Sequence, residues 1–357
     1  MAKKFISELK EGDQLQDVFF VSEKVLATGK TGKPYLSLKL SDKTGTIDGR
    51  VWDKVEMLNT LFDREDFVHV KGSVQLYQGV AQLVIGDIKK VNDLALLNMD
   101  DFIPESGKDL NQLWSEFLRI GKSIKEPFLS SLFTKVFIED RDVAEKLKVY
   151  PAAKSLHHAY KGGLLEHTLN IAKLAELVCN FYGDMLNRDI LIFSALFHDI
   201  GKIRELSFSF ATNYTDEGRL LGHIILADEL LVKKAAEIPN FPPQLLNILR
   251  HILISHHGEY EFGSPKKPKT LEALVIHFLD NLDAKLNGFI LAVDKDAQPG
   301  DWTSVVKAFD RQLYKAKPPT TEAKEQPQSL EKNQANRPKG FNPVLKNFSF
   351  ELFQDKE

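Results

Sequence analysis

Histidine and aspartate side chains interrupt apolar helical patterns at several points in the second half of this chain of 357 residues. The stretch DILIFSALFHDIGK, residues 189–202, is apolar enough for a buried helix, yet it ends on the adjacent pair His198 and Asp199. In LLEHTLNIAKLAELV, His167 shares its helical face with Ile171. Each of these polar groups stands where a leucine would otherwise complete the apolar face.

The same anomaly recurs on three later apolar stretches that the pattern predicts to be helical. It involves His223, His256, His257 and Asp280. A lone histidine on an apolar face is more often a hydrogen-bonded core residue than a ligand. Burying one ionisable group without a partner costs on the order of several kcal/mol. Four or more imidazoles and two carboxylates on separate helices therefore favour a shared partner, and a divalent cation satisfies all of them.

The donor types limit the choice of metal. Cys179 is the single cysteine and lies within an apolar helical pattern, which excludes intrachain disulfides and argues against a thiolate site. Imidazole with carboxylate suits Mn²⁺, Fe²⁺, Zn²⁺, Mg²⁺ or Co²⁺; the residues alone do not choose, and Mn²⁺ is favoured. Asp199 has two carboxylate oxygens directly after His198, so it can bridge two ions. We therefore predict a two-metal site where this helix ends before Gly201.

Such a site is suited to hydrolysis of phosphate esters. Two ions about 3.5–4 Å apart can lower the pKa of a water and clamp the oxygens of a phosphodiester. Lys202, four residues after His198, is suited to neutralise charge that develops on the phosphate. The alternative is a solvated lysine favoured by the helix dipole. Asp283, one turn after Asp280, is a candidate for orienting a ligand or a water.

The chain divides into a β-rich part and a helical part, and the helical part carries these residues. From about residue 15 to residue 91 the hydrophobic pattern has period two, with a short helical piece between the third and fourth of five strands. This is the order of a small Greek-key barrel, the OB-fold. We predict a multidomain protein: an all-β OB-fold barrel over 1–91, a linker over 92–107, an all-α domain over 108–314 and a mostly disordered tail over 315–357. The last helix of the all-α domain is predicted near 302–314.

A barrel of this kind binds single strands by stacking bases on aromatic side chains in a basic groove. The candidates for stacking are Phe19, Tyr35, Trp52 and Tyr77, with Lys33, Lys39, Arg50 and Lys71 nearby. Several of the aromatic side chains must instead fill the barrel. The net charge of −3 excludes binding of nucleic acid by bulk charge, so the groove has to be local.

The order of the polar residues in the helical part resembles that of the HD-domain metal-dependent phosphohydrolases, an all-helical fold, and HDIGK at 198–202 closely matches their motif. The resemblance implies that one metal is held by His167, His198, Asp199 and Asp280. It implies a second metal held by His223 and one or both of His256 and His257, with Asp199 bridging.

The stretch HHAYKGGLLEHT narrows the match, because it resembles the YhaM-type 3'-to-5' exoribonucleases, which join an OB-fold to an HD domain. The resemblance covers roughly residues 10–310. Gly162 and Gly163 are candidates for close backbone approach of a phosphate; His157, His158 and Tyr160 are candidates for contact with that phosphate or the terminal sugar. The alternative is a plain loop with a helix start.

The sequence thus favours an exonuclease that degrades single-stranded RNA, or also DNA, from the 3' end to nucleoside 5'-monophosphates. The alternatives are a phosphohydrolase of small nucleotides and a nucleic-acid-binding module whose HD domain is structural. With no signal peptide and no apolar run of membrane-spanning length, we expect a cytoplasmic protein without membrane contact. The aromatic end of the tail, FNPVLKNFSFELF, either packs on its own domain or binds a protein partner, and a homo-oligomer is left open.

Overall fold

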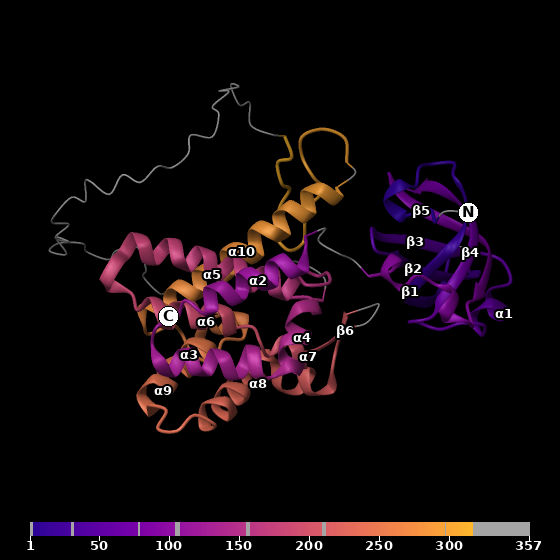
Figure 1. Ribbon diagram of the computed structural model, residues 1–357. Coiled ribbons are helices and arrows are strands. Elements are labelled where there is room, and N and C mark those ends of the chain that lie inside the picture. Colours follow the sequence, from indigo (N-terminus) through magenta and orange to yellow (C-terminus); the bar gives the residue numbers. More distant parts are fainter. Residues whose placement is uncertain are drawn as a thin grey trace. The chain divides into compact units, whose positions relative to one another are not determined.

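The computed structural model describes residues 3–29, 32–77, 79–103, 108–154, 158–208, 212–296 and 298–316 (Figure 1). The predicted tail, apart from its first two residues, lies outside these ranges. Within them, no helix is both long enough and apolar enough to span a bilayer.

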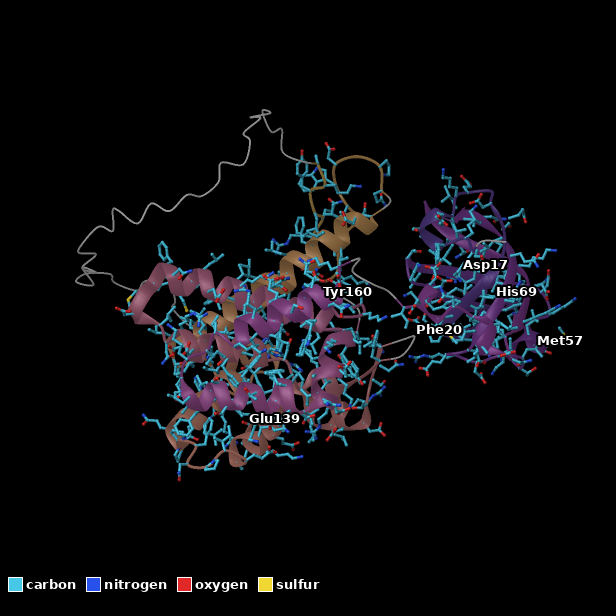
Figure 2. The ribbon with its side chains drawn as sticks, in the orientation of Figure 1. Asp17, Phe20, Met57, His69, Glu139 and Tyr160 are labelled. Carbon is cyan, nitrogen blue, oxygen red and sulfur yellow. The ribbon has the colours of Figure 1, made fainter. Side chains whose placement is uncertain are left out.

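Five strands close into a barrel in the order β1-β2-β3-β5-β4, which confirms the predicted OB-fold. The strands are β1 Gln14–Thr28, β2 Pro34–Asp42, β3 Gly45–Val51, β4 Phe67–Tyr77 and β5 Val80–Lys90. Helix α1, Val55–Asn59, lies between β3 and β4 as expected, and its Met57 points away from the barrel (Figure 2). Alternate residues of β2 are buried, because successive side chains of a strand face opposite sides.

The segment predicted as a linker begins as part of the barrel. It contains two short 3₁₀-helices, η2 Leu94–Leu96 and η3 Met99–Asp101, before Phe102. The buried Phe102 ring packs edge-on against Phe67, which in turn contacts Phe20. The barrel's packing therefore extends about ten residues beyond the predicted boundary at residue 91.

The second part of the chain consists mainly of helices around one large apolar core. The helices are α2 Leu110–Gly121, α3 Pro127–Thr134, α4 Arg141–Val149, α5 Gly163–Tyr182, α6 Arg188–Phe197, α7 Lys202–Glu205, α8 Asp216–Ala236, α9 Pro243–Ser255 and α10 Leu271–Lys295. A π-helical turn, η4 Lys135–Glu139, follows α3, and Asp140 then caps α4. Two further 3₁₀ turns, η5 Gly183–Met185 and η6 Tyr260–Phe262, lie in connecting segments.

Two details correct the all-α prediction. A small hairpin joins β6 Leu206–Phe208 to β7 Thr212–Tyr214. The helix predicted near 302–314 is absent; instead Trp302 pairs with Tyr314, and Val306 with Arg311, in antiparallel bridges. The hydroxyl of Thr303 accepts a hydrogen bond from the backbone of Leu313, so this segment doubles back on itself where the apolar spacing had suggested a helix.

Candidate metal centre

The first cluster of potential ligands lies where α5, the end of α6 and α10 meet. His167, His198, Asp199 and Asp280 each place one ligand atom within 4.8 Å of the others. His167 Nε2 lies 3.2 Å from Asp280 Oδ1 and 3.4 Å from Asp199 Oδ2. His198 follows the last residue of α6 and places its Nε2 3.5 Å from the same Asp199 oxygen. These four residues are the set that the resemblance to the HD-domain phosphohydrolases assigned to one metal.

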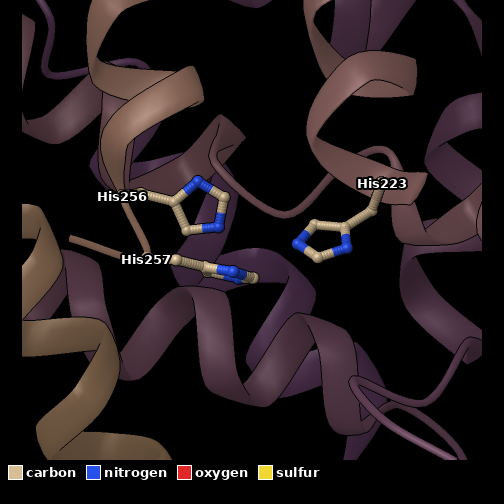
Figure 3. A group of neighbouring side chains, drawn as sticks. All are labelled: His223, His256 and His257. Carbon is tan, nitrogen blue, oxygen red and sulfur yellow. The ribbon is translucent and has the colours of Figure 1, made fainter. Parts of the chain in front are cut away.

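The second cluster contains three imidazoles, those of His223, His256 and His257, whose ligand atoms also lie within 4.8 Å of one another. Their rings come together from α8 and from the end of α9 (Figure 3). His223 Nε2 and His256 Nε2 lie 3.5 and 3.7 Å from Asp199 Oδ1. Asp199 therefore faces the first cluster with Oδ2 and the second with Oδ1, as a bridging carboxylate must.

Both members of the His256–His257 pair reach this cluster, a question that the sequence left open. Adjacent positions of a helix diverge by about 100°. However, α9 ends at Ser255, so the two rings are not held to helical spacing. His257 Nδ1 donates to the carbonyl of Phe262, which turns the ring toward His223.

Backbone carbonyls orient the other rings in the same way. His198 Nδ1 donates to the carbonyl of Ala195 at 2.9 Å, and His256 Nδ1 to that of Leu253 at 2.7 Å. With the proton on Nδ1, the lone pair of each ring is on Nε2 and points into the cluster. Among the described residues, the buried Nε2 atoms of His198, His223 and His256, with Asp199 Oδ1, have no hydrogen-bond partner. Such atoms are costly to bury, and divalent cations fit them.

The sequence did not identify Glu205, which holds His223. The residue before His223, Gly222, has φ of 74° and interrupts α8. The helix in effect restarts at His223, where Glu205 Oε1 accepts from both the backbone N–H and the ring Nδ1 at 3.0 Å. A glycine inside an apolar helical pattern was the only sequence signal for this break.

Asp283 lies behind the first cluster, in agreement with its predicted orienting role. Its Oδ2 accepts from His167 Nδ1 at 2.7 Å and from His158 Nε2 at 2.8 Å, and its Oδ1 accepts from Asn170 at 3.0 Å. Burial raises the pKa of the Asp283 carboxyl, but the two histidines outweigh burial and hold it well below its ordinary value. Asp283 thus stays ionised and fixes the His167 ring with its Nε2 directed at the first cluster.

Lys202 is buried with its Nζ 2.6 Å from Asp199 Oδ2. This position contradicts the alternative of a solvated lysine. Burial lowers the pKa of Lys202, but the Asp199 carboxylate outweighs it and raises the pKa above its ordinary value. Burial likewise raises the pKa of Asp199, while Lys202 and the surrounding imidazoles hold it well below. A fixed positive charge therefore borders the cluster.

Comparison with known proteins agrees with this arrangement. Family models match for the HD domain over residues 164–285 and for the OB-fold nucleic acid binding domain over 20–91; a third model, TraI_2, described as a helicase family, matches 127–185. The 3'-5' exoribonuclease YhaM of Bacillus subtilis (strain 168) is 34% identical over 306 residues, which cover 85% of this chain and 95% of that protein. This chain belongs to the YhaM-type exoribonuclease family.

A second member of the YhaM-type family, from Geobacillus sp. (strain WCH70), is 33% identical over 317 residues, 87% of this chain and 95% of that protein. Among solved structures, the second OB-fold domain of replication protein A from Methanococcus maripaludis is 23% identical over 26% of this chain and 97% of that domain, at a TM-score of 0.22. That score is too low to add to the assignment. The HD match and the two clusters together indicate dependence on divalent metal.

The residues predicted to contact a phosphate or sugar are mostly used by the protein itself. His158 is fully buried, with its ring nitrogens against the Tyr160 hydroxyl and Asp283, which contradicts its predicted contact with substrate. A Cβ on Gly163 would lie 1.9 Å from the carbonyl oxygen of His158. That carbonyl therefore occupies the space beside Gly163 in which a phosphate was predicted to lie. A Cβ on Gly162, whose φ is 76°, would meet the Leu110 side chain at 2.2 Å. His157 lies outside the described residues.

Tyr160 contributes to the same internal network. Its hydroxyl donates to Glu166 at 3.0 Å and lies 2.8 Å from His158 Nδ1. Burial, reinforced by the Glu166 carboxylate, raises the pKa of Tyr160 above its ordinary value, so the hydroxyl stays protonated. We therefore interpret Tyr160 as a support for His158, rather than as the substrate contact that the sequence suggested.

The barrel carries a pair of stacked aromatic side chains, Tyr35 and Trp52, which forms an aromatic platform. The rings of Tyr35 and Trp52 stack with centroids 4.6 Å apart and planes 26° apart, and Trp52 is about half exposed. Tyr77 is exposed as well. Phe19, in contrast, is fully buried in the barrel core and is wrong as a stacking candidate.

Proposed function

We propose that this protein is a divalent-metal-dependent exonuclease that degrades single-stranded RNA, and also single-stranded DNA, from the 3' end and releases nucleoside 5'-monophosphates. The observation that carries the proposal is the position of Asp199, each of whose oxygens faces a separate group of buried imidazoles. The relatives that cover most of the chain are named 3'-5' exoribonucleases, which supports the direction of cleavage and the preference for RNA.

Two ions would be held in the centre. The first is assigned to His167, His198, Asp280 and Asp199 Oδ2, and the second to His223, His256, His257 and Asp199 Oδ1. Mn²⁺ is the favoured ion, and Fe²⁺, Zn²⁺, Mg²⁺ and Co²⁺ are alternatives that this mixture of imidazole and carboxylate suits as well. When bound, the ions would supply Lewis-acid stabilisation of the phosphate and lower the pKa of a nucleophilic water.

The chain's own residues then have defined tasks. Lys202 keeps its proton beside Asp199, and its charge favours an anionic phosphate at the centre. Asp283 and Glu205 hold His167 and His223 with their Nε2 atoms facing inward. The burial of His198, Asp199 and His256 excludes bulk water from the ligands, which strengthens every charge interaction there.

The aromatic side chains of the barrel favour a single strand, and not a free nucleotide, as the substrate. The Tyr35–Trp52 stack offers a flat aromatic surface that matches the face of any base. Stacking of this kind contributes about 1–3 kcal/mol per base and needs no sequence readout. An enzyme for small nucleotides has no use for such a platform, so we favour a strand as the substrate.

The test compares strands labelled at the 5' end, with a free or a phosphorylated 3' end, against free nucleotides. We expect a ladder of shortening products and nucleoside 5'-monophosphates from the strand with the free 3' end. Hydrolysis of free nucleotides without a ladder would support the small-nucleotide alternative. Strand binding without any hydrolysis, under each divalent ion in turn, would support the purely binding alternative.

A further inference from the structure

Helix α10 carries its metal-centre residues on one face and a stripe of apolar side chains on the opposite one. Six large apolar side chains of this stripe are between 37% and 59% exposed. They are Leu271, Leu274, Phe278, Leu282, Leu286 and Phe289. At 100° per residue these positions fall within a sector of about 120° of the helix, and the first and last are about 27 Å apart. An exposed stripe of this length marks an interaction surface.

The spacing within this stripe is symmetric. Leu271 and Phe289 are each nine positions from Asp280, Leu274 and Leu286 are each six positions from it, and Phe278 and Leu282 are each two. If α10 is rotated by a two-fold axis that passes beside residue 280, every apolar side chain meets an apolar partner. In a parallel pair each side chain would face its own counterpart whatever the spacing, so only the antiparallel pair requires this symmetric spacing.

We propose that the α10 stripe packs antiparallel against the same stripe of a second copy of this chain, about a two-fold axis beside position 280. Such an interface is isologous: Phe278 of one copy faces Leu282 of the other, and Leu274 faces Leu286. Lys285 is the charged residue within the stripe, and the same symmetry places it beside Val275 of the second copy. Its aliphatic stem can cover that valine while the ammonium reaches solvent.

The size of the surface fits a second copy. Six large side chains of roughly 150–200 Å² each, about half exposed, offer on the order of 500 Å² of apolar surface. A stable interface takes about 800 Å² from each partner, and its rim is polar. The stripe thus supplies the apolar centre. Because Asp280 and Asp283 lie on the inner face of the same helix, dimerisation would also brace a helix that holds the metal centre.

The first experiment measures the molar mass of the full-length protein by light scattering across a concentration series. We expect a dimer, or an assembly that contains dimers, and expect Leu286→Asp to weaken the association at least tenfold. Met57→Asp on the barrel helix α1 is the matched control, because Met57 and Leu286 are both 54% exposed. A monomeric wild type, or equal mass for wild type and Leu286→Asp, would overturn the proposal.

The second experiment tests the register and excludes the tail as the occupant. Phe278→Cys protein mixed with Leu282→Cys protein should form a disulfide-linked dimer under oxidised glutathione, while the buried Cys179 stays unreacted. A disulfide within Phe278→Cys protein alone, with no disulfide between the two variants in the mixture, would indicate a parallel pair and refute the antiparallel register. Protein truncated after Ala316 should keep the wild-type association; loss of association there would assign the surface to the tail.

Discussion

The replacement Asp283→Asn removes one charge and keeps nearly the same shape. Three donors converge on the Asp283 carboxylate, from His167, His158 and Asn170. An asparagine has one acceptor oxygen, so its amide N–H₂ must face at least one of these donors. Because His167 and His158 share one carboxylate oxygen, the ring of His167 then faces either a neutral oxygen or an N–H₂ group, and it loses the charge-assisted hydrogen bond that keeps its Nε2 directed at the first cluster.

The magnitude follows from the role of the hydrogen bond between Asp283 and His167. Removing the residue that orients a metal-binding histidine typically lowers metal affinity 10–100-fold, which corresponds to about 1.4–2.7 kcal/mol. The second cluster touches neither Asp283 nor its donors directly. We therefore expect one of two binding events to weaken by this factor and the other to change little.

Calorimetric titration of metal-free protein with Mn²⁺ measures both events without reference to turnover. Asp294→Asn is the matched control, because Asp294 is an exposed acid on the same helix. Equal Mn²⁺ affinities for Asp283→Asn and wild type, with both proteins folded, would refute the role assigned to Asp283. A similar loss in Asp294→Asn would show that bulk charge, and not orientation, is responsible.

Three further outcomes are expected. The folded pKa of Asp283 lies below its unfolded value of about 3.9, so the ionised carboxylate contributes fully to the free energy of unfolding above about pH 4. This contribution is lost as the pH falls through the folded pKa. In acid denaturation, the difference in stability between metal-free wild type and Asp283→Asn should therefore close below about pH 4. Glu205→Ala should weaken the second Mn²⁺ binding event about 10–100-fold and leave the first in place, whereas weakening of both would mean that the clusters are not separate. Trp52→Ala should weaken binding of a single strand by about 1–3 kcal/mol in fluorescence anisotropy without metal, and an unchanged affinity would remove the stack from the proposed path.

The features that local pattern encodes were predictable from the sequence. The barrel follows from period-two strands and turn residues, and the ligand set follows from polar residues on apolar helical faces, whose burial only a shared partner can offset. His256 and His257 could not be resolved because the end of α9 is set by its packing, not by its composition.

The remaining features depend on contacts between distant segments. Glu205 becomes a partner of His223 only because α8 breaks at Gly222. His158 looked like a surface contact, but Asp283, 125 residues later, holds it inside. The segment 302–314 has helical spacing, yet its strand-like bridges form in place of a helix.

Asp199 is the residue that joins the two proposed metal sites, and metal stoichiometry tests this role most directly. After equilibrium dialysis against Mn²⁺ and elemental analysis, the wild type should retain two ions per chain. Asp199→Asn should retain fewer than two and should lose hydrolysis of a single strand while binding it as before. Two ions retained by Asp199→Asn, or a single ion in fully active wild type, would contradict a bridging role for Asp199.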